Sequence, residues 1–268
     1  MRARAARSAS RQLIPAAVEK LTDGLQPRLV WENEDALTFE FGQYPDRRFV
    51  KWASASSYLD LTAEAERMTW AAPFTSVPDV LATGADEEGS WLVTAALPGT
   101  CAVQDWWKAK PEATVRAIGE GLRAMHEAMP VPDCPFSWMA EERVERARHR
   151  AAADQIDPVR DWQPEHLGYS IPQALDLVAD IPPVDRLVVC HGDACAPNTL
   201  LTDDGRCGGH VDLGDLGVAD RWADLAIATW STTWNYGPGW QDVLLDAYGI
   251  APDEARTRYY RLLWDLSS

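Results

Sequence analysis

Three oxygen-bearing side chains fall in one short stretch of the chain and could together serve phosphoryl transfer. Asp193, Asn198 and Asp212 lie within residues 187–217, where a histidine and several glycines surround the first acid. Phosphoryl transfer needs a carboxylate near the attacking hydroxyl and oxygen ligands for the metal ions that bridge the nucleotide phosphates. The order of residue types predicts that Asp193 is the catalytic carboxylate and that Asn198 and Asp212 bind Mg²⁺.

Short runs of strand-forming residues surround these side chains and would position them. Residues 187–190, 199–202 and 209–213 are predicted strands, and the Asp203-Asp204-Gly205 sequence predicts a turn that reverses the chain. We expect an apolar hairpin on which Asn198 and Asp212 face each other.

A second chemical pair precedes this region. Lys51 ends a run of strand-forming residues, and Glu64 lies in residues 61–71, which have the composition of a helix. Residues 29–41 are also rich in strand formers, so an N-terminal antiparallel sheet is predicted. An ion pair from strand to helix would fix the lysine ammonium as a point charge for nucleotide phosphates, although either residue alone would be an ordinary surface charge.

The ordered combination of these motifs resembles the catalytic core of the aminoglycoside phosphotransferases, small-molecule kinases with a protein-kinase-like fold, and is most similar to the 3′-type. The resemblance rests on His191-Gly192-Asp193 with Asn198, then on Val211-Asp212-Leu213-Gly214, on 216–221 and on 224–226. A lone His-Gly-Asp sequence would be weak, whereas the ordered set is specific.

The resemblance implies an α+β fold of two lobes. Residues 1–96 would form a small nucleotide-binding lobe with an antiparallel sheet, and residues 97–268 a larger, mainly helical lobe for catalysis and acceptor binding. The lobes would meet near residues 97–99, with the nucleotide between them.

The resemblance also assigns further residues. ATP would be the phosphoryl donor, with Thr94 at the back of its pocket and the backbone of Ala95 and Leu97 at the adenine edge. Carboxylates would bind the ammonium groups of the acceptor, and the candidates are Asp157, Asp161 and Glu165 in the polar segment 154–166, together with Asp265 near the C-terminus.

Three departures from the family pattern bear on substrate handling. Residues 32–36 contain no glycine where relatives carry a glycine-rich phosphate loop, so backbone cradling of the β-phosphate is in question. Asp215 stands where many relatives have arginine, and Trp264 stands in place of one acid of the C-terminal tail. We expect these departures to leave catalysis intact and to affect which acceptor the protein binds.

Other polar residues near the catalytic acid are interpreted as structural. His191 is expected to organise the loop backbone rather than transfer a proton, and Asp224 to brace the catalytic loop. Cys190 and Cys195 match no zinc-binding spacing and are expected to be inert thiols.

Composition limits the remaining possibilities. Five cysteines, an odd number without paired spacing, indicate a reducing compartment, so a cytoplasmic location is predicted. No stretch is apolar enough to span a membrane, and residues 1–11 are interpreted as a leader or start-site extension. A formal charge of −16, concentrated in residues 101–268, disfavours nucleic acid as a partner and favours a cationic small molecule.

The leading hypothesis is an ATP-dependent phosphotransferase that phosphorylates a hydroxyl of an aminoglycoside antibiotic and so confers resistance. An alternative keeps the reaction and changes the acceptor to another small hydroxylated metabolite or antibiotic. A pseudokinase or interaction protein is disfavoured because Lys51, Glu64, Asp193, Asn198 and Asp212 are all present. The oligomeric state is left open.

Overall fold

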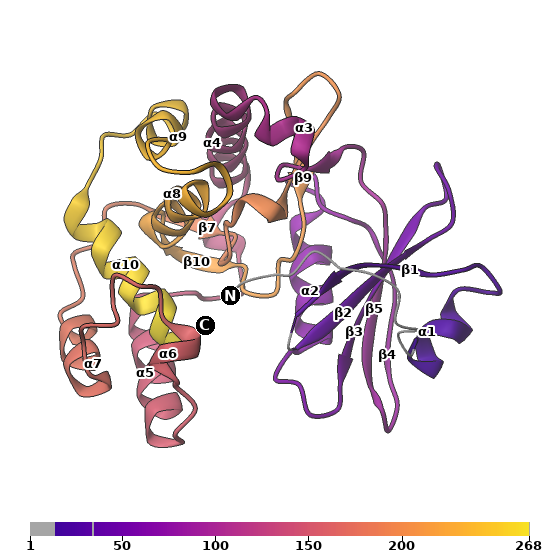
Figure 1. Cartoon of the computed structure of the whole chain (residues 1–268), viewed down its shortest axis with the longest axis horizontal. Coiled ribbons are helices and arrows are strands. Elements are labelled where there is room, and N and C mark those ends of the chain that lie inside the picture. Colours follow the sequence, from indigo (N-terminus) through magenta and orange to yellow (C-terminus); the bar gives the residue numbers. More distant parts are fainter. Residues whose placement is uncertain (1–13, 34, 268) are drawn as a thin grey trace. The chain divides into compact units, whose positions relative to one another are not determined.

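The computed structural model describes residues 14–33 and 35–267, and the chain divides into two compact units, residues 1–97 and 98–268 (Figure 1). The first unit is built on a sheet and the second mainly on helices, which confirms the predicted α+β fold class. The segment 1–11, interpreted above as a leader, lies outside the described residues.

The first unit contains a five-stranded antiparallel sheet with the strand order β1-β2-β3-β5-β4. Its elements are α1 (Ala16–Leu21), β1 (Arg28–Glu32), β2 (Ala36–Phe41), β3 (Arg48–Ser54), α2 (Leu61–Ala71), β4 (Val80–Ala85) and β5 (Gly89–Ala95). The strand-forming residues at 29–41 and the run around Lys51 predicted an antiparallel sheet here, and they correspond to β1, β2 and β3.

Alternation along β3 gives the two faces of the sheet different tasks. Val50 and its cross-strand neighbour Val93 are buried in a cluster that also contains Val18 of α1. Lys51, one residue later, points to the opposite face, because successive side chains of a strand alternate. There its Nζ atom meets Glu64 of α2.

Helix α2 begins and ends as the sequence predicted. Asp60 caps its N-terminus, since the Asp60 carboxylate accepts a hydrogen bond from the Ala63 N–H at 2.9 Å. Leu61, Glu64 and Met68, spaced three and four apart, share the buried face that packs on β4 and β5. Glu64 therefore reaches the sheet because of its place in the helical repeat.

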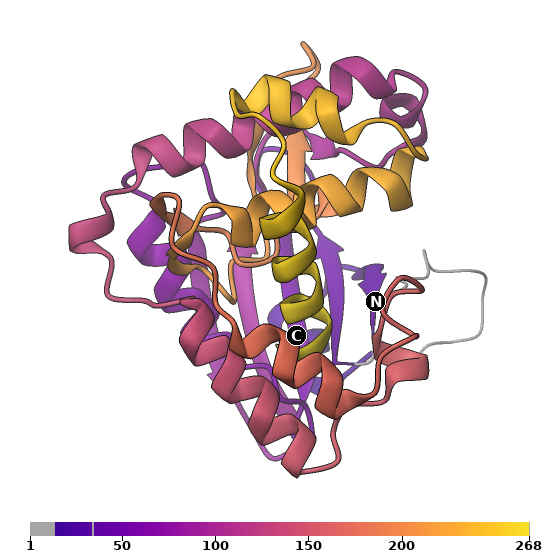
Figure 2. The same cartoon turned by 90° about the vertical axis from the view of Figure 1, so that its left-hand side faces the viewer.

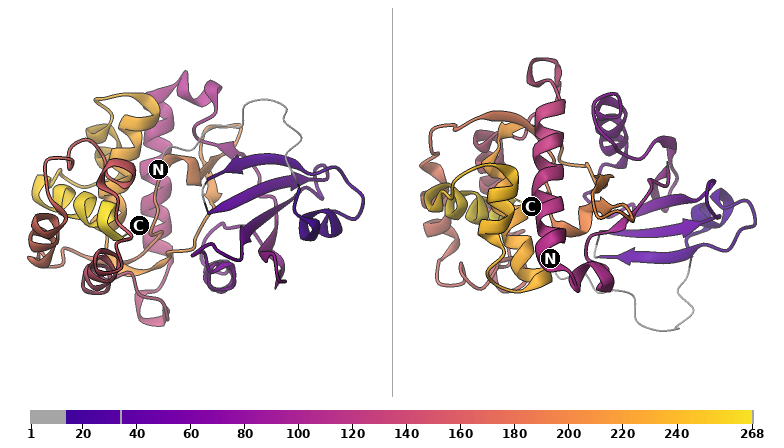
Figure 3. Two further views of the ribbon diagram at one scale, coloured as in Figure 1. Left: turned by 60° about the horizontal axis from the view of Figure 1, so that its bottom comes forward. Right: turned by 90° about the horizontal axis from the view of Figure 1, so that it is seen from above.

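The second unit is organised around buried helices. Its helical elements are α3 (Asp105–Lys108), α4 (Pro111–Ala128), η1 (Val131–Asp133), α5 (Ala140–Ala152), α6 (Pro158–Asp161), α7 (Ile171–Ala179), η2 (Ala196–Asn198), α8 (Trp222–Tyr236), α9 (Gln241–Tyr248) and α10 (Glu254–Ser267). The yellow C-terminal helix α10 packs against α5, α7 and α8 (Figure 2). The long helix α4 packs along α9 (Figure 3).

Short strands carry the predicted catalytic residues, and their pairing differs in part from expectation. The strands are β6 (Thr100–Cys101), β7 (Leu187–Cys190), β8 (Thr199–Leu201), β9 (Cys207–His210) and β10 (Gly217–Asp220). β8 and β9 form the predicted hairpin, and β6 adds a third strand beside β8. β7 pairs instead with β10.

Two local predictions were wrong in detail. The predicted strand 209–213 ends at His210, because Asp212 has a φ of +66°, a left-handed conformation that no strand accommodates. Within the polar segment 154–166, the predicted loop contains the single helical turn α6, which Asp157 caps through the Val159 N–H. No helix in the described parts of the chain is long and apolar enough to cross a membrane.

Close packing of α4 on α9 generates a stability prediction. A Cβ at Gly119 would lie 2.5 Å from the Leu244 carbonyl oxygen and 3.0 Å from Ala247 Cβ. Gly119→Ala should therefore lower the free energy of unfolding by about 1–3 kcal/mol, although alanine is the better helix former by about 1 kcal/mol.

Denaturant unfolding would measure this effect, with Glu120→Ala at the adjacent exposed position as the control, expected within about 0.5 kcal/mol of the parent protein. A Gly119→Ala protein more stable than the parent would contradict the close approach of the two helices.

Candidate active site

The buried carboxylate of Asp224 fixes the backbone that carries the candidate catalytic acid. Asp224, in the first turn of α8, accepts hydrogen bonds from the His191 N–H at 2.6 Å and from the Gly192 N–H at 2.9 Å. Burial alone would raise the pKa of Asp224, but hydrogen bonds led by that of His126 hold it below the usual value. Asp224 is thus an ionised brace for the loop, the role predicted for it.

The side chain of His191 serves the same loop. Its Nε2 atom lies 3.0 Å from the Val211 carbonyl oxygen, and its Nδ1 atom accepts the Asp193 N–H at 3.3 Å. Both ring nitrogens are therefore occupied by backbone groups, in agreement with the predicted structural role. Gly192 adopts a φ of +89°, and a Cβ there would lie 2.3 Å from the Asp215 carbonyl oxygen, so the turn requires glycine.

Asp193 and Asn198 contact each other directly. The Asn198 Nδ2 atom donates to the Asp193 carbonyl oxygen at 2.9 Å and to the Asp193 Oδ2 atom at 3.0 Å. Asp193 Oδ1 is buried, and a hydrogen bond with the Cys195 side chain favours the ionised carboxylate. Burial raises the pKa of Asp193, and the negative charge of Asp212 acts in the same direction. The carboxylate is thus held in place by Asn198, with Oδ1 on its buried side.

Asn198 and Asp212 meet at the same end of the hairpin. The Val211 N–H donates to the Asn198 carbonyl oxygen at 3.0 Å, so Asp212 follows directly after the residue paired with Asn198. The Asp212 side chain is exposed, and its left-handed backbone turns it away from the strand. Because Nδ2 of Asn198 is occupied, Oδ1 is the end that remains for a cation.

This donor set fits Mg²⁺. The oxygen donors here are the Asp212 carboxylate and the Asn198 amide oxygen, and hard oxygen donors are what Mg²⁺ prefers. The described residues contain one cluster of histidine, cysteine and acid side chains spaced for a metal ion, His126, Cys190 and Asp224. Both ring nitrogens of that histidine are hydrogen-bonded, so the cluster is a structural network.

The predicted strand-to-helix ion pair is formed in the first unit. Lys51 Nζ lies 2.8 Å from Glu64 Oε2, with side-chain exposures of 17% and 6%. A pair so shielded from water is attracted more strongly than a surface pair. Glu64 therefore fixes the position of the Lys51 ammonium.

The segment after β5 offers fewer backbone groups than expected. The Ala95 N–H already donates to the Asp79 carbonyl oxygen at 2.9 Å, so this donor is not open to a ligand. No described residue accepts a backbone hydrogen bond from the Leu97 N–H. Thr94 is buried, opposite Phe49 in the sheet.

The turn between β1 and β2, which has no glycine, is closed by a side chain. Asn33 Oδ1 accepts the Asp35 N–H at 3.0 Å and the Ala36 N–H at 2.7 Å. These two backbone donors are therefore not available to cradle a phosphate. Glu34 lies outside the described residues.

Two candidate acceptor acids are occupied by local structure. Asp157 caps α6, and Asp161 accepts the Asp157 N–H at 2.9 Å while it pairs with Arg160 Nε at 2.7 Å. The pKa of Asp161 is lowered, because these hydrogen bonds outweigh the effect of partial burial.

The other two candidate acids differ sharply from each other. The side chain of Glu165 is 44% exposed and lies 3.7 Å from His166 Nε2 and 3.8 Å from Arg261 Nη1. Asp265 is buried, and its Oδ2 atom accepts hydrogen bonds within the protein. Glu165 and Asp157 are thus the exposed candidates, and of these two Asp157 is engaged as the cap of α6.

Sequence reasoning missed two partners of the site, one buried and one partly exposed. His126 belongs to no motif of the sequence, yet its Nε2 atom meets Asp224 Oδ2 at 2.9 Å and its Nδ1 atom meets the Tyr248 hydroxyl at 2.8 Å. Asp215, which replaces an arginine of many relatives, lies 3.8 Å from Arg146. These partners are far away in sequence, so no local pattern could have identified them.

Burial accounts for the two cysteines beside the loop. It raises the pKa of Cys190 and of Cys195 well above the ordinary value, which keeps both thiols protonated. This supports the expectation that they are inert.

Comparisons with known proteins agree with the motifs. The model of the phosphotransferase enzyme family matches residues 27–260. An aminoglycoside 3′-phosphotransferase of Streptomyces fradiae is 39% identical over 221 residues, which cover 79% of this chain and 81% of that protein. Streptomycin 3″-kinase of Streptomyces griseus is 35% identical, with coverages of 80% and 82%.

Solved structures give the same result. The crystal structure of an aminoglycoside-3′-phosphotransferase of type VIII has a TM-score of 0.80 and 30% identity, covering 93% of this chain and 96% of that one. The aminoglycoside phosphotransferase APH(3″)-Id of Streptomyces rimosus, in complex with ADP and streptomycin, has a TM-score of 0.73 and 27% identity, with coverages of 92% and 94%. The sequence, its motifs and its fold therefore show that the chain belongs to the phosphotransferase enzyme family that includes the aminoglycoside phosphotransferases.

Proposed function

We propose that this protein is an ATP-dependent aminoglycoside O-phosphotransferase that transfers the γ-phosphoryl group to a hydroxyl of the antibiotic and thereby confers resistance. The observation that carries this proposal is the Asp193–Asn198 pair beside Asp212, on a loop that Asp224 holds by two backbone hydrogen bonds. Relatives that phosphorylate aminoglycosides, by their names, span most of the chain.

Asp193 would act on the acceptor hydroxyl. Transfer of this kind is loose and mostly dissociative, so the carboxylate need only orient the hydroxyl and accept its proton late. Asn198 keeps Oδ2 of this carboxylate fixed, so the group is held ready for the acceptor hydroxyl. The raised pKa of Asp193 makes it a better proton acceptor than an ordinary aspartate.

Asn198 and Asp212 are the residues that would hold Mg²⁺. When bound, the ion would neutralise charge on the nucleotide phosphates. The exposed Asp212 carboxylate and the Asn198 Oδ1 atom supply the oxygen ligands for it.

Residues of the first unit would bind the nucleotide. Lys51, held by Glu64, would contact the α and β phosphates, and the backbone of Ala95 and Leu97 would meet the adenine edge. Because the Ala95 N–H is occupied, its carbonyl would be the contacting atom. Thr94 would close the back of the pocket.

The acceptor is proposed to be a cationic aminosugar, and the acidic second half of the chain would attract it. Glu165 is the carboxylate best placed to meet an ammonium group, because Asp157 caps α6 and Asp161 pairs with Arg160. A kinase that acts on another small hydroxylated metabolite or antibiotic is the second candidate, favoured by Trp264 and by the burial of Asp265. A cytoplasmic site of action fits the five unpaired cysteines.

A panel of acceptors assayed by ADP release tests the proposal. Kanamycin-type aminoglycosides should be turned over, and their KM should rise with ionic strength because attraction to exposed acids is screened. Phosphorylation of a neutral sugar or nucleoside, with a KM that ignores salt and with no aminoglycoside turned over, would support the second candidate instead.

Removal of the proposed proton acceptor should affect turnover and spare nucleotide binding. Asp193→Asn should lower kcat by about 10²- to 10⁴-fold and leave the KM for ATP within about twofold.

Asp203→Asn, an exposed acid in the turn of the same hairpin, is the control and should match the parent enzyme. An Asp193→Asn protein that retains more than about a tenth of the parent turnover would remove Asp193 from the reaction.

Loss of the Lys51–Glu64 ion pair should weaken nucleotide binding and leave acceptor binding unchanged. Glu64→Gln should raise the KM for ATP about tenfold, because the Lys51 ammonium loses the carboxylate that fixes it, while the KM for the acceptor stays unchanged. Glu66→Gln changes an exposed acid on the same helix and should have no effect. Equal effects on both substrates would argue against a role specific to the nucleotide.

A further inference from the structure

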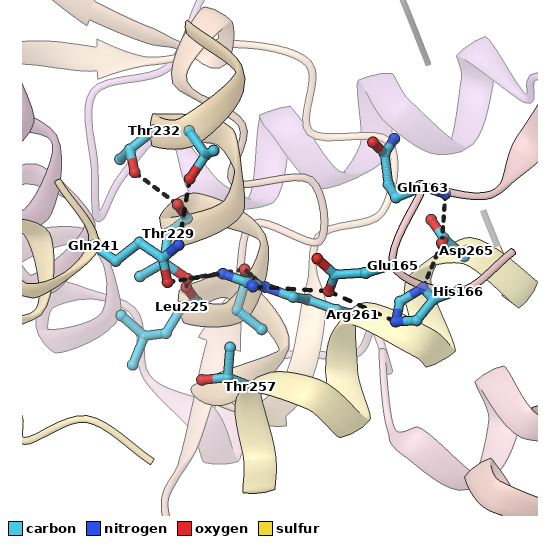
Figure 4. Close-up of polar contacts among 12 residues, drawn as sticks. Gln163, Glu165, His166, Leu225, Thr229, Thr232, Gln241, Thr257, Arg261 and Asp265 are labelled. Carbon is cyan, nitrogen blue, oxygen red and sulfur yellow. Dashed lines mark hydrogen bonds and ion pairs between the residues drawn. The ribbon is translucent and has the colours of Figure 1, made fainter. Parts of the chain in front are cut away.

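A buried acid in the C-terminal helix holds the segment that carries the proposed acceptor carboxylate. Asp265 Oδ2 accepts the Gln163 N–H at 2.9 Å and lies 2.6 Å from His166 Nδ1 (Figure 4). Its side chain has no exposed surface, and His166 is almost as buried. Two segments about a hundred residues apart are thus joined at one carboxylate.

The residues on either side of this contact form a continuous network. His166 Nε2 lies 3.7 Å from Glu165 Oε1, which lies 3.8 Å from Arg261 Nη1, one helical turn before Asp265 (Figure 4). Arg261 in turn donates to Thr229 and Gln241, both at distances of 3.2–3.3 Å. Glu165 is therefore flanked by the His166 imidazole, which Asp265 of α10 holds, and by the Arg261 guanidinium, which contacts of α8 and α9 hold.

The network also reaches the catalytic loop through aromatic rings. His166 packs edge-on against Trp230 at a centroid distance of 5.6 Å, and the Arg261 guanidinium lies 5.2 Å from the same ring. Trp230 and Trp264 belong to one buried cluster, and Cys195 packs against it. Cys195 is two residues beyond Asp193, so the contacts run without a break from Asp265 to the catalytic acid.

We infer that Asp265 is a positioning residue, which with His166 forms a latch that fixes residues 163–166 so that the Glu165 carboxylate is presented to the acceptor. This inference rests on the proposed function. It reassigns Asp265, which the sequence predicted to bind the acceptor itself.

The geometry excludes direct contact of Asp265 with an acceptor in the described conformation. Oδ2 is occupied by two donors, and Oδ1 is buried without a partner among the described residues. A hydrated sugar ammonium would have to displace the packed helix to reach either oxygen. Glu165, with 44% of its side chain exposed, has no such obstacle.

An acid at this position does more than fill space. Burial of a carboxylate is costly, and an apolar side chain of the same size would pack α10 at least as well. The carboxylate instead fixes the direction of the Gln163 N–H and the rotation of the His166 imidazole, which an apolar side chain cannot do.

Matched substitutions at His166 separate the latch from general packing. The amide nitrogen of asparagine falls near the position of Nδ1, whereas that of glutamine falls near Nε2. His166→Asn can therefore keep the bond to Asp265, and His166→Gln cannot. Asp265→Asn removes the charge without a change of volume.

We expect Asp265→Asn and His166→Gln to raise the KM for the aminoglycoside about tenfold, with kcat and the KM for ATP within about twofold, as loss of one charge-assisted hydrogen bond predicts. His166→Asn should stay close to the parent enzyme. Amide hydrogen exchange of residues 162–170 should speed up in the first two variants and not in the third.

A double-substitution cycle with Glu165→Gln tests whether Asp265 acts through Glu165. If it does, Asp265→Asn adds little to the KM effect of Glu165→Gln, so the two effects are not multiplicative. Multiplicative effects would show that Asp265 meets the acceptor independently and would overturn the latch. So would an unchanged KM together with unchanged exchange in both Asp265→Asn and His166→Gln.

The test also distinguishes failure of the latch from failure of the proposed function. If the parent protein releases no ADP with any aminoglycoside, the proposed function fails, and hydrogen exchange in residues 162–170 still decides the latch. If Asp265→Asn does not fold, His166→Gln retains the buried acid and provides the same comparison.

Discussion

The hydrogen bonds that Asp224 accepts from the His191 and Gly192 N–H groups are the constraint on which the site depends. A sharp turn between a strand and a catalytic acid leaves backbone donors without strand partners, and buried donors without acceptors are costly. The first turn of α8 supplies that acceptor, and His126 and Tyr248 hold it from the other side. The position of Asp193 therefore follows from a residue that is itself remote from the reacting atoms.

The acids of the second unit form two groups, buried acids that accept hydrogen bonds from the protein and exposed acids. Asp220, Asp224 and Asp265 are buried, and each accepts hydrogen bonds that join separate segments, such as the Asp185 N–H to Asp220 at 2.8 Å. Asp212 and Glu165 are exposed and occupy the places proposed for a cation and a cationic acceptor. An acidic composition thus serves two purposes, since a carboxylate surrounded by donors fixes the chain while an exposed one attracts a ligand.

Each departure from the family pattern has a physical counterpart in the structure. The turn that lacks glycine uses the Asn33 side chain to satisfy the backbone donors of residues 35 and 36. The arginine missing at position 215 has a counterpart in Arg146, which approaches Asp215 from helix α5. Trp264 replaces an acid of the tail and joins the aromatic cluster behind the catalytic loop. One of the three departures thus lies in the turn between β1 and β2, and the other two lie in the second unit.

The sequence by itself determined the elements whose evidence is local. Helix α2 spans the predicted residues because its apolar spacing and Asp60 cap lie within one window, and the thirteen-residue step from Lys51 to Glu64 then suffices for an ion pair. Only the tertiary structure decided the pairing of β7 with β10, the bond of His126 to Asp224 and the burial of Asp265. Those contacts join residues about thirty to a hundred positions apart. The pattern of apolar residues within one segment does not indicate which distant segment it will contact. Side chains of the same type therefore took opposite roles, Glu165 open to solvent and Asp265 closed within the fold, because packing rather than residue type sets which carboxylate a ligand can reach.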